Sequence, residues 1–162
     1  MYDIVKDLYF LRRDLISDGY NDALDYISKK IPLKIHSIPS GTKCWTWTVP
    51  EKWTVKEAYI EVNGKKLLDL HDHPLHVISY SLPIDKIVSH EELMKHLHSN
   101  PKRPNAIPFQ FKYYEKDWGF CIEHERLNNF NYNEYHVVIK SNFEKDSIKI
   151  GEVLIKGETD ET

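Results

Sequence analysis

The chain has 162 residues, of which 41% are hydrophobic and 29% are charged, with 25 acidic and 22 basic side chains. This length suits one domain, or one domain with an inserted subdomain, and it is too short for two independent enzyme domains. The nearly balanced charge indicates no basic surface for nucleic acid and no long charged tail for an oppositely charged partner.

The N-terminus and the cysteines indicate the cellular compartment. Charges begin at Asp3 and no long apolar run follows, so the sequence predicts neither a signal peptide nor a membrane-spanning helix, and we expect a cytoplasmic protein. Cys44 and Cys121 lie far apart and form no Cys-x-x-Cys motif. In a reducing compartment this pattern favours two free, buried thiols over a disulfide.

The first elements expected are two amphipathic helices. Apolar residues recur at helical spacing from Ile4 to Leu15, and the stretch 17–19 then breaks the pattern. The same spacing returns over residues 20–27, with Asn21 and Asp22 as the expected caps of the second helix. Both helices need a sheet to cover.

The hydrophobic period then changes to two, which predicts strands over residues 33–36 and 45–49. A hairpin is expected from Val55 to Leu70, because Asn63-Gly64 is the dipeptide preferred by a two-residue type I′ turn.

Further strands are expected over 77–82 and 109–114, and 135–140 is expected to pair with 148–155 across residues 142–147. The capping-box pattern that starts at Ser89 predicts a helix through His98. The expected fold class is therefore α+β, with N-terminal helices and a mostly antiparallel β-sheet.

The densest group of chemically capable side chains is the stretch from His71 to His76. Residues two apart on a strand share a face, so His71 and His73 could reach one metal ion, with Asp72 or His76 as a further ligand. A cupin-type site does not fit, because apolar residues occupy the positions where its Glu is needed. Two alternatives stay open. In one, His76 bonds to the backbone and His71 is solvated; in the other, the loop is part of a substrate-binding rim.

Nucleophilic catalysis has weaker support, because the sequence contains no Gly-x-Ser-x-Gly elbow and neither cysteine lies in an activating motif. Aromatic residues in or beside the expected strands are mostly expected in the core. Tyr114 lies on the opposite face of its strand from Phe111 and Tyr113, which makes it the better pocket candidate.

Several stretches together resemble a known family. The resemblance covers essentially the whole chain and rests on Ser40-Gly41-Thr42, 47–53, 75–83, 106–109, Tyr113-Tyr114, 118–121, Gly151-Glu152 and Gly157-Glu158-Thr159-Asp160-Glu161. They are similar to those of aminopeptidase-like proteins related to the M28 zinc peptidases, which carry domains of unknown function of the 4910 and 2172 types and often occur among polysaccharide-biosynthesis proteins.

The resemblance implies a peptidase core interrupted by an inserted β-rich subdomain. By similarity, residues 1–41 and 106–162 belong to the core and residues 42–105 form the insert. Family members continue from the Gly-Glu-Ser/Thr-Asp-Glu stretch into a strand with a His-x-Cys-His-Pro-like motif that supplies the metal site. Because this chain ends at Thr162, we expect the catalytic metal of the intact protein to lie beyond it.

The resemblance implies that the intact protein is a zinc-dependent hydrolase of amide bonds, and that the insert shapes its substrate pocket. Zinc is expected in the parent protein and no cofactor in this chain. The residues expected on the substrate side are His76, His71, His73, Tyr114 and Trp118.

The expected partners are the remainder of the peptidase-like chain, or a separately encoded second half, and a peptide or acylated small-molecule substrate. Self-association through an open sheet edge is also expected, whereas nucleic acid and membrane are not. The competing hypothesis is a non-catalytic binding module for a sugar or a partner chain.

Overall fold

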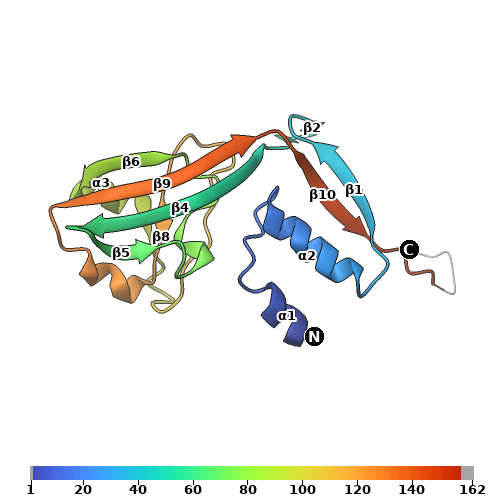
Figure 1. The fold of residues 1–162 in the computed structure, drawn as a ribbon, viewed down its shortest axis with the longest axis horizontal. Coiled ribbons are helices and arrows are strands. Elements are labelled where there is room, and N and C mark those ends of the chain that lie inside the picture. The colour runs from blue at the N-terminus through green and yellow to red at the C-terminus, as the bar shows by residue number, and fades with distance from the viewer. Residues whose placement is uncertain (1, 158–162) are drawn as a thin grey trace. The chain divides into compact units, whose positions relative to one another are not determined.

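Two compact units make up the chain in a computed structural model that describes residues 2–157. The first unit consists of Met1–Lys52 with Lys145–Thr162, and the second is Trp53–Glu144. Their helices and antiparallel strands, drawn in Figure 1, confirm the α+β class. The last part of the Gly157–Glu161 stretch lies outside the described residues. Within the described residues, no helix has the length and apolar character needed to cross a membrane.

The first unit begins with two short helices. Its elements are α1 (Tyr2–Leu8), α2 (Asp18–Ser28), β1 (Lys34–Pro39), β2 (Lys43–Cys44), β3 (Trp47–Thr48) and β10 (Ser147–Glu152). The helix expected to reach Leu15 ends at Leu8, and Ser17, not Asn21 or Asp22, caps α2 by accepting a bond from the Tyr20 N–H at 3.2 Å. The extended backbone of Ser17 suits a cap, which is why it takes this role.

Strands β1 and β10 pair in antiparallel register from Lys34↔Glu152 to Pro39↔Ser147. The prediction that β9 (Glu134–Glu144) would pair with β10 is therefore wrong. The Ser40 N–H donates to the Asp146 carbonyl at 2.8 Å, and this bond directs the chain after β9 onto β1. The strand expected over 45–49 is likewise replaced by the β2–β3 hairpin.

The second unit is built on a four-stranded sheet with the order β5-β4-β9-β6. Its other strands here are β4 (Lys52–Val62), β5 (Lys65–Asp69) and β6 (Ile84–Ser89). Figure 1 shows β4 and β9 running in opposite directions. The predicted hairpin is confirmed, because β4 and β5 pair around Asn63 and Gly64, whose φ angles of 51° and 75° are those a type I′ turn needs.

Smaller elements cover one face of this sheet. They are η1 (Pro74–His76), α3 (His90–His96), β7 (Leu97–His98), β8 (Phe120–Cys121) and η2 (His124–Asn129). The helix start predicted at Ser89 is confirmed, since its hydroxyl accepts a bond from the Glu92 N–H at 3.2 Å. The helix ends at His96, and Leu97 and His98 instead form β7, parallel to β8.

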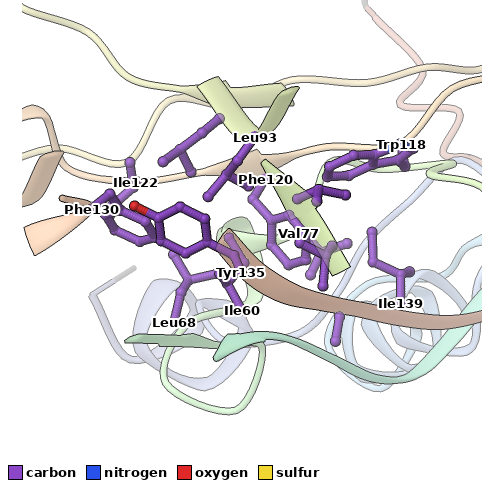
Figure 2. Packing of buried hydrophobic residues seen from close by; sticks show 14 of the residues in the cluster. Ile60, Leu68, Val77, Leu93, Trp118, Phe120, Ile122, Phe130, Tyr135 and Ile139 are labelled. Carbon is purple, nitrogen blue, oxygen red and sulfur yellow. The ribbon is translucent and has the colours of Figure 1, made fainter. Parts of the chain in front are cut away.

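The core of this unit lies between the sheet and these elements (Figure 2). Tyr135, Val137 and Ile139 alternate along β9 and face Leu93 of α3 and Phe120 of β8; all five are at most 1% exposed. Burial of side chains of this size contributes about 1.5–3 kcal/mol each.

Two predicted strands are absent as continuous elements. Residues 77–82 and 109–114 form no strand, and their only β-pairing within the described residues is through the isolated bridges Val77↔Phe120 and Ser79↔Phe111. Tyr80 has a φ of 67°, and the Ser81 hydroxyl donates to the Ile78 carbonyl at 2.7 Å. This local turn interrupts the extended conformation that a strand requires.

The division into a peptidase core and an insert stays a prediction about a longer protein. The compact second unit, Trp53–Glu144, has other bounds than the expected insert at 42–105.

Candidate functional site

The stretch from His71 to His76 follows strand β5 and begins beside Asp69. The Asp69 carboxylate accepts bonds from the His71 backbone N–H at 2.9 Å and the Lys66 ammonium at 2.6 Å, and it contacts His71 Nδ1 at 2.8 Å. Burial raises the pKa of Asp69, but these bonds outweigh it and bring the pKa down to about 2. The His71 side chain itself is 72% exposed.

His73 and His76 each make a hydrogen bond to the backbone that stabilises this loop. His73 Nδ1 accepts a bond from the Leu75 N–H at 3.1 Å and so caps the short helix η1. Burial lowers the pKa of His73, as does the neighbouring His76. His76 is 1% exposed and donates from Nδ1 to the Cys121 carbonyl at 2.9 Å.

The three histidines therefore have three different partners and do not converge on one point. No group of three or more His, Cys, Asp or Glu side chains able to hold a metal ion occurs within residues 2–157. The interpretation in which His76 bonds to the backbone agrees with this geometry. A metal site formed by His71 and His73 does not fit it.

Neither cysteine is in a disulfide, as predicted. Cys121 is fully buried, and burial raises the pKa of its thiol to about 12, which keeps it in the unreactive thiol form. Cys44 is half-buried, less so than predicted.

Trp118 belongs to a polar cluster that the sequence interpretation missed. Its indole stacks on the His96 ring with 3.9 Å between centroids, and it is 8% exposed. His96 Nδ1 lies 3.0 Å from the Trp118 carbonyl and 3.3 Å from Asp117 Oδ1, and Nε2 lies 3.2 Å from Glu92 Oε1. The i,i+4 spacing of Glu92 and His96 on a predicted helix is a signal that could have found this pair.

Lys112 forms ion pairs within the loop that carries this cluster. Its ammonium donates to Asp117 at 2.6 Å and to Glu115 at 3.1 Å. Burial lowers the pKa of Lys112, but the two carboxylates raise it by more. The pKa of Asp117 is lowered, because the bonds from Lys112 and the Trp118 N–H outweigh the effect of burial. No sequence spacing pointed to this pair.

The same loop presents aromatic rings to solvent. Three of them form what we call the aromatic strip: Phe109, Phe111 and Tyr114, which are 60%, 54% and 61% exposed. The Phe111 ring stacks on Tyr113 at 4.6 Å, and Tyr113 meets the buried Tyr80 edge-on at 4.8 Å. Phe111 is thus connected to the core through Tyr113, and Phe109 lies 6.1 Å from Phe111 between ring centroids.

The predicted substrate-side residues are therefore distributed over two places. His71, His73 and His76 lie in the loop after β5, and Tyr114 and Trp118 lie in the loop before β8. Only Tyr114 and His71 present much surface, since His76 and Trp118 are buried. This surface is suited to binding a ligand. It has flat apolar rings for stacking and, beside them, the ion pair of Lys112 and Asp117.

Comparison with known proteins gives a consistent result. Residues 52–142 match a family described as "Domain of unknown function (DUF2172)". A Clostridium acetobutylicum protein named "Putative polysaccharide biosynthesis protein with aminopeptidase-like domain" is 37% identical over 162 residues, which are 99% of this chain and 37% of that protein. A crystal structure of a "putative peptidase" from the same organism matches with a TM-score of 0.87 and 37% identity, over 98% of this chain and 38% of that one. The chain thus spans under two-fifths of these relatives' length.

Proposed function

The chain belongs to the DUF2172 family, and from this membership and the names of its longer relatives we propose that it forms part of a zinc-dependent, aminopeptidase-like hydrolase related to the M28 peptidases. The observation that carries the proposal is the match of almost the whole chain, in sequence and in structure, to just over a third of a peptidase-like protein. The hydrolysed bond is an amide in a peptide or in an acylated small molecule.

The second unit supplies the substrate side in this proposal. The aromatic strip faces solvent, and the half-buried Lys112–Asp117 pair lies on the same loop. Backbone bonds fasten this loop to the core, such as that from the Lys112 N–H to the Ser79 carbonyl at 2.8 Å. A long irregular loop held in one conformation is typical of a binding loop. His71 and His73 form the rim, while His76 and Trp118 support it from below.

The zinc ion belongs to another part of the longer protein in this proposal. The histidine loop does not fit zinc, because no group of three or more His, Cys, Asp or Glu side chains within residues 2–157 is arranged to hold a metal ion. When bound, zinc would supply a hydroxide nucleophile at neutral pH. The residues of this chain would bind and orient the substrate.

The test compares this chain with the longer protein, produced by extending the reading frame or by adding a separately encoded second half. We expect hydrolysis of leucine p-nitroanilide only by the longer protein, with loss of activity on chelation and recovery on addition of zinc. Hydrolysis by this chain alone, or by the longer protein without zinc, would contradict the proposal.

The role of the aromatic strip is tested by Phe111→Ser in the longer protein, which should raise KM with little change in kcat. The matched control is Ile87→Ser, because Ile87 is also an exposed apolar residue, at 67%, but lies on β6. Equal effects of the two variants on KM would argue against a substrate role for the strip.

A second candidate function is a non-catalytic binding module, and the aromatic strip favours it. Exposed flat rings can stack on the apolar face of a sugar or receive a partner chain. Titration with oligosaccharides followed by isothermal calorimetry would support this function if the chain alone binds them. Binding that Phe111→Ser does not weaken would count against it.

Self-association through the β1–β10 ribbon also remains a proposal. Ile35 and Ile150 in these strands are 41% and 46% exposed, which leaves apolar side chains for a further strand to cover. Sedimentation of Ile150→Lys against the unchanged chain tests this idea, since a monomer in both cases would reject it.

A further inference from the structure

One histidine joins three strands on the outer face of the four-stranded sheet. His136 lies on the inner strand β9, between Glu61 on β4 and Asp85 on the edge strand β6. Its Nδ1 lies 2.9 Å from Glu61 Oε1, and its Nε2 lies 2.7 Å from Asp85 Oδ1. Because Tyr135 and Val137 face the core, His136 points away from it.

The two contacts demand a proton on each ring nitrogen. An ionised carboxylate only accepts hydrogen bonds, whereas a neutral imidazole has one N–H and one lone pair. The imidazolium can therefore bond both acids, while the neutral ring must leave one of them facing a lone pair. Bonds to Glu61 and Asp85 raise the pKa of His136, which agrees with this geometry.

Other charged and titratable groups surround this triad. Tyr59 and Glu57 lie on β4, Lys66 lies on β5, and Lys140 lies on β9 itself. The Tyr59 ring meets His136 edge-on at 6.1 Å, and Lys66 lies over Tyr59 while it pairs with Asp69. Lys140 pairs with Glu57, and the nearby charge of Asp85 also raises the pKa of Lys140. Both lysines thus already have acidic partners of their own.

We propose that His136 is a proton-operated clamp, which bonds Glu61 of β4 and Asp85 of β6 to β9 when it is protonated and gives up one of these two bonds when it loses its proton. The bond of greater consequence is the one to Asp85, because it adds to the backbone pairing that holds β6 on β9. Strand β6 lies at the edge of the sheet and leads directly into α3, whose His96 contacts Trp118 and Asp117 in the loop before β8. Loss of the proton would therefore loosen the strand that precedes the candidate binding surface.

The sign of the pH effect follows from the raised pKa. The stabilisation by the clamp is complete below the pKa of His in the unfolded chain, about 6.5, and is lost as the pH rises through the higher folded value. Each unit of pKa elevation changes the unfolding equilibrium constant about tenfold between these limits.

The first experiment is an NMR titration of the histidine ring protons in the whole chain. We expect the midpoint of His136 above 6.5, with a fall in Glu61→Gln and in Asp85→Asn. The matched control is His36, which contacts a single carboxylate, Glu152, at 2.6 Å. Its midpoint should be unchanged in both variants. A His136 midpoint at or below 6.5 would overturn the proposal.

The second experiment measures urea unfolding at pH 6 and pH 9. Between pH 6 and pH 9, the free energy of unfolding of the unchanged chain should fall by more than that of His136→Gln. In His36→Gln it should fall by as much as in the unchanged chain. An equal loss with and without His136 would refute the clamp. If His136→Gln does not fold, Glu61→Gln and Asp85→Asn provide the same comparison.

Discussion

Gly119 lies where the candidate binding loop joins the core, and its replacement by alanine tests whether close packing holds the loop in place. A Cβ at this position would lie 2.6 Å from Ile78 Cδ1 and 3.0 Å from the His96 carbonyl oxygen. Ile78 is 1% exposed, so its side chain has no solvent to move into, and the carbonyl belongs to the backbone. Overpacking of this kind costs about 1–3 kcal/mol.

A double-mutant cycle isolates the contact. Ile78→Val removes the Cδ1 atom and leaves Cγ1, which lies 3.5 Å from the added Cβ, an ordinary contact distance. Alone, Ile78→Val should cost about 0.5–1.5 kcal/mol. Combined with Gly119→Ala, it should cost less than the sum of the two changes, by at least about 0.5 kcal/mol.

The assay is urea unfolding followed by far-UV circular dichroism and by tryptophan fluorescence, to which Trp118, the neighbour of Gly119, contributes. Gly64→Ala is the control, because Gly64 has open space around it and a φ of 75°, so that it reports backbone strain without a clash. Additive effects of Gly119→Ala and Ile78→Val would refute the packing argument, as would a cost for Gly119→Ala within about 0.5 kcal/mol of zero.

Three further predictions concern single groups. Ser89→Ala should lower the free energy of unfolding by about 1 kcal/mol, since it removes the cap of α3, whereas Ser89→Asp should not. Thiol titration should modify Cys44 in the folded chain and Cys121 only after unfolding, and rapid modification of Cys121 would contradict its burial. Stability due to Asp69 should be present above the unfolded pKa of about 3.9 and lost as the pH falls toward 2, so acid unfolding of Asp69→Asn should be less steep in that range.

Elements that depend on neighbouring residues were predictable from the sequence. The β4–β5 hairpin follows from Asn63-Gly64, whose backbone preferences require no distant contact. The start of α3 follows from Ser89 for the same reason. The α+β class follows from the change of hydrophobic period. One error was local, because the turn at Tyr80 breaks an otherwise strand-like stretch. Another was tertiary, because β10 pairs with the distant β1 and not with the preceding β9.

The candidate site shows the same division. The sequence by itself identified the chemically rich histidine stretch, the exposed Tyr114 and the family resemblance, because residue types and their order are sufficient for these. Only the tertiary structure decided that His76 donates into the core and that Trp118 stacks on His96. The pairings of β1 with β10 and of His136 with Glu61 and Asp85 were also decided there. Such contacts join residues far apart in the chain. The local sequence pattern does not specify which distant residues come together on folding.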